Sequence, residues 1–122
     1  MNKSNLEYAK QYYDWIVKKD LNNINNLLHE TIEFVGPMCT IKGKSEVFSA
    51  ITGYAKIVED IEIIDKFSSN DKVMLTYLLT YQKQKSRAAV MLTFTNNLIK
   101  KLDLYYDPTP FLNMRNDIFS DE

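Results

Sequence analysis

The chain has few of the residue types that build metal, disulfide and nucleotide sites. Its 122 residues include one cysteine, one histidine, three glycines and three prolines. Cys39 therefore has no internal disulfide partner, and a zinc site usually needs three or four cysteine, histidine or carboxylate ligands. No glycine-rich phosphate-binding loop occurs. We expect no metal and no organic cofactor, and the position of His29 at a helix end disfavours a Cys39–His29 nucleophilic pair.

Strong charge and long hydrophobic runs are also missing. The formal net charge is −1 and the sequence pI is about 5.8, so neither a nucleic acid nor an anionic membrane is an expected partner. No apolar run is long enough to span a bilayer, and the N-terminal segment MNKSNLEYAK lacks the apolar core of an export signal. The composition is that of an ordinary globular protein. We expect one cytoplasmic domain over residues 1–122.

The N-terminal part of the sequence has helical periodicity. Ser4 and Glu7 form a capping-box pattern, and the helical pattern continues to Lys19. The apolar and aromatic residues of this helix fall on one arc, a little over half the circumference: Leu6, Tyr8, Ala9, Tyr12, Tyr13, Trp15, Ile16 and Val17. An arc this wide predicts a helix that a curved partner envelops.

Two further helices and a strand follow. Asp20 is the expected cap of a short second helix, whose inward stripe is Leu21, Ile24, Leu27 and Leu28. Residues 31–35 alternate like a strand and lead to Gly36-Pro37. A third helix is expected from Ser45, with one apolar side made of Val47, Phe48, Ile51, Tyr54, Ala55 and Val58.

From Glu59 the hydrophobic period becomes two. This period predicts four long strands, over residues 60–67, 72–82, 87–95 and 98–107. The short breaks between them require an antiparallel meander, and Asn96-Asn97 suits a tight hairpin turn. The apolar phase slips between Ile99 and Leu102, which predicts a β-bulge. Helices followed by a meander indicate an α+β fold with the helices on one face of the sheet. The C-terminal segment could add one short helical turn.

This order of elements resembles the nuclear transport factor 2-like superfamily, particularly its SnoaL-like and ketosteroid-isomerase-like branches. The segments that match are YYDWIVKKDLNNINNLL, EFVGPMCTIKGKSEV and LTFTNNLIKKLDLYYD, and the likeness extends from Leu6 to Phe111. The resemblance implies a cone-shaped, strongly curved antiparallel sheet closed by N-terminal helices, a cystatin-like α+β barrel. It also implies a deep apolar pocket and a homodimer that packs sheet against sheet.

The resemblance transfers only part of a catalytic site. The tyrosine that stabilises an oxyanion in ketosteroid isomerases corresponds to Tyr12. The position of their general base, an aspartate before a proline, is Gly36, and the position of their second acid is Val90 or Met91. A glycine cannot accept a proton, and losing a positioned base commonly costs about 10²–10⁴ in rate. Isomerisation by that mechanism is therefore disfavoured.

The catalytic residues of other branches of the superfamily also lack full counterparts in this sequence. Limonene-epoxide-hydrolase relatives use an Arg and an Asp two residues apart, and the local form Arg87-Ala88-Ala89 lacks the acid. SnoaL-like cyclases use an aspartate on a late strand with a nearby histidine. Here Asp103 and Asp107 are the acids of the last strand, and Asp103 is expected to face outward.

We therefore expect a pocket for a small apolar molecule and favour binding without ketosteroid-isomerase chemistry. The expected ligand-binding residues are Tyr12, Trp15, Phe34, Met38, Phe48, Tyr54 and Val90. The alternative is an isomerase, cyclase or dehydratase in which Tyr12 polarises a carbonyl and Asp107 or a bound water is the base. No catalytic residue is assigned, and Tyr12 and Asp107 are only candidates. The structural alternative for Tyr12 is plain core packing. For Asp107 it is an ordinary Asp-Pro turn.

Overall fold

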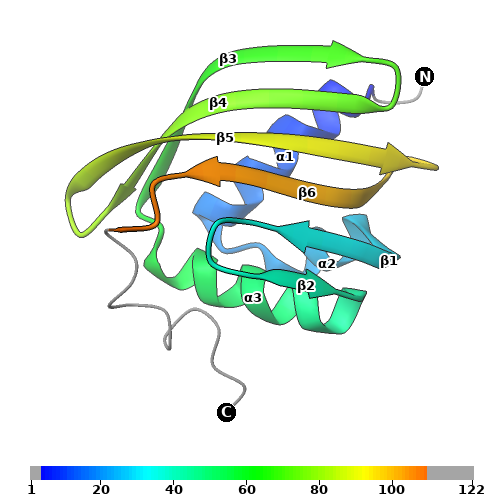
Figure 1. Ribbon diagram of the computed structural model, residues 1–122, viewed down its shortest axis with the longest axis horizontal. Helices are drawn as coiled ribbons and strands as arrows, with labels where there is room; N and C mark the ends of the chain where they lie inside the picture. Colours follow the sequence, from blue (N-terminus) through cyan, green and yellow to red (C-terminus); the bar gives the residue numbers. More distant parts are fainter. Residues whose placement is uncertain (1–3, 110–122) are drawn as a thin grey trace.

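The computed structural model describes residues 4–109 and consists of helices packed on one curved sheet (Figure 1). The helices come first in the chain, apart from two strands that lie between α2 and α3. The elements are α1 (Asn5–Lys18), α2 (Leu21–Leu27), β1 (Leu28–Val35), β2 (Thr40–Lys42), α3 (Lys44–Ile57), β3 (Asp60–Ser69), β4 (Lys72–Tyr81), β5 (Gln84–Thr95) and β6 (Leu98–Tyr106). The α+β class is confirmed.

The predicted caps of the first two helices are present. The Ser4 hydroxyl accepts a hydrogen bond from the Glu7 backbone N–H, and the Glu7 carboxylate accepts one from the Ser4 backbone N–H. This reciprocal box satisfies two of the N–H groups that the first helical turn leaves unpaired. Asp20 caps α2 through the Asn23 backbone N–H. Both helices therefore begin where the sequence predicts.

The six strands form one sheet in the order β2-β1-β6-β5-β4-β3. Strands β3 to β6 are the predicted antiparallel meander, but β1 pairs with β6 in parallel, with Phe34 opposite Leu102. The sheet is therefore mixed rather than antiparallel throughout. It is curled and does not close into a barrel. The short strand β2, which the sequence analysis did not predict, pairs with the end of β1.

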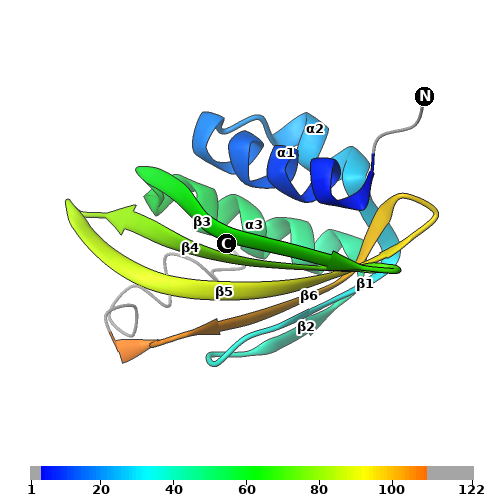
Figure 2. The same cartoon turned by 90° about the horizontal axis from the view of Figure 1, so that it is seen from above.

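The sheet curves around the helices, which all lie on its concave side (Figure 2). Two β-bulges contribute to this curvature. One lies at Lys100, between the pairs Thr93–Lys101 and Phe94–Ile99, and is the bulge predicted in the last strand. The other lies at Ile64 in β3. An enveloped α1 is confirmed, because Ala9 and Ile16 are fully buried against the sheet.

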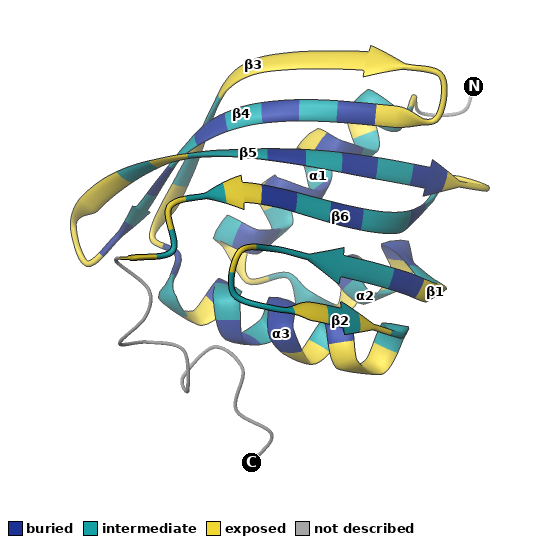
Figure 3. Ribbon diagram, viewed as in Figure 1, coloured by how far each residue is buried: buried dark blue, intermediate teal, exposed yellow. Residues whose placement is uncertain are grey.

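The core lies between the helices and the concave face, and burial alternates along the central strands (Figure 3). In β4 the buried residues are Val73, Leu75, Tyr77, Leu79 and Tyr81. Their neighbours point to the outer face, as a period of two requires. This alternation fixes which side chains of the meander face the helices.

Within the described part of the chain, no helix combines the length and hydrophobicity needed to cross a bilayer. The short C-terminal helical turn suggested by the sequence falls outside residues 4–109, as do Pro110 and all later positions.

Candidate functional site

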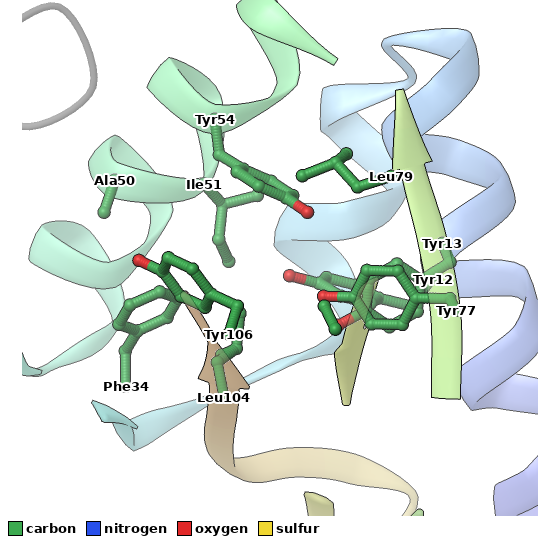
Figure 4. A pocket seen from close by; sticks show the side chains of 11 residues that line it. Tyr12, Tyr13, Phe34, Ala50, Ile51, Tyr54, Tyr77, Leu79, Leu104 and Tyr106 are labelled. Atoms are coloured by element: carbon green, nitrogen blue, oxygen red, sulfur yellow. The ribbon is translucent and has the colours of Figure 1, made fainter. Parts of the chain in front are cut away.

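A cavity opens between α1, α3 and the concave face of the sheet (Figure 4). The space left between its side chains is about 30 Å³, enough for about two water molecules. Its wall is aromatic and aliphatic, and five of its members are tyrosines. The lining residues are Tyr12, Tyr13, Phe34, Ala50, Ile51, Tyr54, Tyr77, Leu79, Ala88, Leu104 and Tyr106.

The sheet register explains why the cavity is where it is. Tyr77 on β4 pairs with Ala88 on β5, and Ala88 pairs with Tyr106 on β6. Two large side chains therefore flank a methyl group, which leaves the middle of this row empty. In the next inward-facing row Val90 occupies the equivalent place and is completely buried. The cavity ends where the side chain on β5 becomes large enough to fill the row.

The hydroxyls of four tyrosines converge at one end of the cavity (Figure 4). Tyr77 shares hydrogen bonds with Tyr13 on α1 and with Tyr54 on α3. The ring of Tyr12 packs edge-on against that of Tyr13, with the ring centroids 4.8 Å apart. These contacts link α1, α3 and β4 through side chains that are both bulky and polar.

Burial sets the ionisation of this group. It is the main cause that raises the pKa of Tyr12, Tyr13, Tyr54 and Tyr77. For Tyr12 the second cause is the neighbouring Tyr77, without a hydrogen bond between the two. All four phenols are consequently neutral at physiological pH and act as hydrogen-bond donors or acceptors rather than as bases.

The structure brings three of the seven expected ligand-binding residues to the cavity wall: Tyr12, Phe34 and Tyr54. Trp15 and Phe48 are half-buried and pack against the core without lining the cavity. Met38 and Val90, expected to border the cavity, do not line it either. Met38 packs against the core from the β1–β2 turn, and Val90 fills its own row. Whether any of these residues contacts a ligand stays a prediction.

The two candidate acids of the last strand lie elsewhere. Asp107 is exposed just beyond β6, and its carboxylate accepts a hydrogen bond from the Thr109 backbone N–H at 3.0 Å. That bond lowers the pKa of Asp107, which makes it a weaker base. Asp103 has the opposite phase to the buried Leu102 and Leu104 and accepts a hydrogen bond from the Tyr105 hydroxyl at 3.2 Å. No carboxylate among the described residues lines the cavity.

Gly36 lies next to the cavity wall, at the end of β1. A Cβ atom built there would be 3.7 Å from the Phe34 ring and 3.8 Å from the Tyr106 ring, which are ordinary contact distances. A side chain at this position would therefore point at the cavity rim. The backbone N–H of Gly36 donates to the Cys39 carbonyl at 2.9 Å and closes the turn into β2.

Cys39 and His29 lie at opposite ends of β1. His29 is in the strand rather than at a helix end, and its Nδ1 accepts a hydrogen bond from the Thr31 backbone N–H. Cys39 follows the far end of the strand, roughly 23 Å away at 3.3 Å per residue. The two side chains cannot form a nucleophilic pair. Residues 4–109 also contain no cluster of three or more histidine, cysteine or carboxylate side chains suited to a metal ion.

Sequence reasoning did not identify Tyr13, Tyr77, Ala88 or Tyr106 as site residues. The available signal was the alternation in RAAVMLTFT, where Ala88 shares the inward phase of Val90. This alternation locates the cavity only when the register between β4 and β5 is known. The two-residue turn Gln82-Lys83 sets that register. Both residues have positive φ, 47° and 62°, a conformation that glycine and asparagine favour. Because neither residue is a glycine or an asparagine, the sequence did not predict a two-residue turn here.

No known family model matches the sequence, and no curated protein matches it significantly. Solved structures do resemble it. An NTF2-like protein of unknown function from Cytophaga hutchinsonii aligns with a TM-score of 0.77 and 17% identity, over 91% of this chain and 96% of that one. A steroid delta-isomerase from Pseudomonas aeruginosa has a TM-score of 0.77 and 18% identity, over 95% and 90%.

A de novo designed protein with a curved β-sheet aligns as well as the natural ones. Its TM-score is 0.83 at 17% identity, over 98% of both chains. Likenesses at this level of identity describe the arrangement of the backbone and not the chemistry of a site. The chain has the nuclear transport factor 2-like fold.

Proposed function

We propose that this protein binds a small, mainly apolar molecule in the tyrosine-lined cavity and does not carry out ketosteroid-isomerase chemistry. The observation that carries the proposal is the composition of the wall. Among the described residues it offers hydrocarbon surface and phenol hydroxyls but no carboxylate and no imidazole. Such a wall desolvates and orients a ligand, yet supplies no base that could abstract a proton.

Tyr12 is the group best placed to recognise a polar atom of the ligand. Tyr13 and Tyr54 direct their hydrogen bonds to Tyr77, whereas Tyr12 does not bond to Tyr77. Its buried, neutral hydroxyl can therefore donate to a carbonyl or hydroxyl oxygen. The ligand class that follows is a ring or short apolar body carrying one oxygen.

The cavity must widen to accept such a ligand, because benzene needs a cavity of about 150 Å³. The wall has members that can move. Phe34 and Tyr106 are only half-buried, whereas Tyr12, Tyr13 and Tyr77 are 2–3% exposed. Movement of the half-buried rings costs less than disruption of the hydroxyl cluster.

A thermal-shift screen with steroids, polyketide fragments and terpenoids tests the proposal, followed by titration calorimetry of the hits. The decisive variant is Ala88→Leu, which fills the empty middle of the Tyr77–Tyr106 row. The matched control is Ala89→Leu, one residue along the same strand on its outer face. We expect Ala88→Leu to abolish ligand binding and Ala89→Leu to preserve it. Equal loss or equal retention in both variants would place the binding site elsewhere.

We also propose a homodimer through the outer face of the sheet. On that face Phe67, Met74 and Met91 form one cross-strand row over β3, β4 and β5. Phe67 is 65% exposed, and a contiguous exposed apolar row favours an interface. A cytoplasmic location completes the proposal, because a chain with the single cysteine Cys39 needs no internal disulfide and suits a reducing compartment.

Sedimentation velocity at micromolar concentration tests the dimer. The variant Met91→Lys places a charge in the middle of the row and should give monomers. Lys85→Met, at the β4–β5 hairpin, is the control and should leave the dimer intact. A wild-type protein that sediments as a monomer removes the dimer from the proposal without affecting the cavity.

A further inference from the structure

Tyr106 differs from the other tyrosines of the cavity wall. It is the last residue of β6 and is half-buried. Its hydroxyl points away from the cluster formed by Tyr12, Tyr13, Tyr54 and Tyr77, toward Ala50 on α3 (Figure 4). Burial, with a smaller contribution from Cys39, raises the pKa of Tyr106 to about 12, so the phenol that lies across the edge of the cavity is uncharged.

The Phe34 ring lies beside this tyrosine, but three of its other neighbours are small (Figure 4). Its cross-strand partner on β5 is Ala88. On the β1 side lies Gly36, where even an added Cβ would be 3.8 Å from the ring and 4.0 Å from the hydroxyl oxygen. On the helix side the wall residue is Ala50. Three elements thus place an alanine or a glycine around one tyrosine.

This arrangement gives the ring room to rotate. In a close-packed interior an aromatic side chain is locked by the bulk of its neighbours. Small neighbours on three sides lower that barrier, and a half-buried ring loses less apolar contact when it rotates toward solvent than a fully buried one. Tyr77, at the other end of the row, is 2% exposed and is held by two hydrogen bonds. Tyr77 is therefore the more deeply buried of the two rings, and Tyr106 is the one whose displacement exposes less apolar surface.

We propose that Tyr106 is the gate of the cavity and sets the size of ligand that it admits. This inference rests on the proposed binding function. Outward rotation of the ring opens a path past Gly36 and Ala88 and vacates a space of the ring's own size beside the tyrosine cluster. A ligand must compete with the phenol of Tyr106 for that space, so the wild-type protein favours single-ring over two-ring ligands.

The variant Tyr106→Ala removes the competing ring and should leave the gate permanently open. The probes are phenol, with one ring, and 2-naphthol, with two. We expect Tyr106→Ala to bind 2-naphthol at least tenfold more tightly than the wild type and to associate with it at least tenfold faster, as measured by calorimetry and stopped-flow fluorescence. Tyr106→Phe retains the ring and should behave like the wild type.

Tyr105→Ala is the matched control, because Tyr105 is the adjacent residue of β6 on the opposite face of the sheet. It should leave both affinities within twofold of the wild type. If Tyr106→Ala prevents folding, Tyr106→Leu replaces it, since leucine keeps an apolar side chain but removes the ring. Near-ultraviolet circular dichroism establishes which variants are folded.

The outcomes separate the gate from the binding function. If the wild type binds phenol but Tyr106→Ala shows neither tighter nor faster binding of 2-naphthol, the gate is overturned and the cavity remains a binding site. If folded Tyr106→Ala and the wild type both fail to bind either probe, the gate is overturned together with the proposed function, because an open cavity of this composition should take up an aromatic molecule.

Discussion

Tyr77 and Tyr106 stand in one row of the concave sheet face, separated only by Ala88. The two rings have different constraints. Tyr77 is buried and bonded to Tyr13 and Tyr54, whereas Tyr106 is half-buried beside Gly36. The cavity exists because the residue between them is an alanine. Its polar end holds the hydrogen-bonded tyrosines, and its other end is bordered by the half-buried ring of Tyr106.

The buried phenols predict a fold that is sensitive to alkali. In the unfolded chain tyrosines ionise near pH 10, but burial raises the pKa of Tyr12, Tyr13, Tyr54 and Tyr77 in the fold. Above pH 10 the unfolded state therefore holds fewer protons than the folded state, and the free energy of unfolding falls as pH rises. Each phenol contributes at most about 1.4 kcal/mol per pH unit. Urea titrations between pH 8 and 11.5 measure this slope.

Tyr12→Phe provides the comparison for the alkaline slope. It removes one ionisable group while keeping the ring, so the slope above pH 10 should become shallower by about 1.4 kcal/mol per pH unit. For each protein, the free energy of unfolding at pH 7 serves as the reference for its curve of stability against pH. A slope identical to that of the wild type would show that Tyr12 ionises as readily in the fold as in the unfolded chain.

The hydroxyl of Tyr12 should discriminate between ligands with and without an oxygen. Acetophenone and ethylbenzene have similar shapes, but only the ketone accepts a hydrogen bond. We expect Tyr12→Phe to weaken the binding of acetophenone by about 1 kcal/mol, the net value of a typical hydrogen bond, and to leave ethylbenzene unaffected. Calorimetry of both ligands with both proteins measures the difference. Equal weakening of the two ligands would assign Tyr12 a packing role only.

Gly36 and Gly43 should respond differently to the same substitution. Gly43 has φ +95°, where a Cβ is strained, so Gly43→Ala should destabilise the protein by about 1–2 kcal/mol. A methyl group at Gly36 meets only ordinary contacts, and Gly36→Ala should be neutral or stabilise the protein by up to about 1 kcal/mol because it restricts the unfolded chain. Chemical denaturation of both variants measures the two effects. Equal destabilisation would contradict the open position at Gly36.

Gly36→Asp extends this comparison to the chemistry of the rim. It should fold and place a carboxylate against the rings of Phe34 and Tyr106, where desolvation raises the pKa of the new group above its usual range near 3.9. Carbon-13 NMR titration of the labelled carboxyl measures that pKa. An unshifted value would mean that the side chain points to solvent and not at the cavity rim.

Lys19 joins the ends of two helices. It caps α1 in the left-handed conformation, and its Nζ donates to the Val58 carbonyl after α3 at 2.6 Å. Lys19→Met removes the charge-assisted bond and should cost about 1.5–3 kcal/mol. The control Lys18→Met removes an exposed ion pair with Asp14, which is worth roughly 0.5 kcal/mol or less. Thermal melts that rank the two variants in the reverse order would contradict the role of Lys19.

The local signals in the sequence determined most of the elements, though not the short strand β2. Ser4 and Glu7 fixed the start of α1, and the period of two along residues 72–81 fixed the inward face of β4. Asn96-Asn97 marked its turn correctly, since both residues have positive φ. The phase slip after Ile99 located the bulge. Each of these features depends on residues close together in the chain, whose conformational preferences act without tertiary partners.

Tertiary structure alone decided which elements meet. The parallel pairing of β1 with β6 joins residues about seventy positions apart, and no local preference specifies such a contact. The cavity depends on register across three strands, which places Ala88 between two tyrosines and Val90 in a filled row. Hydrophobic periodicity states which face a side chain occupies but not the size of the neighbours it will meet there. The sequence by itself therefore determined that Tyr12 is buried, and the packing of distant strands decided that it borders a cavity whose wall, among residues 4–109, contains no carboxylate.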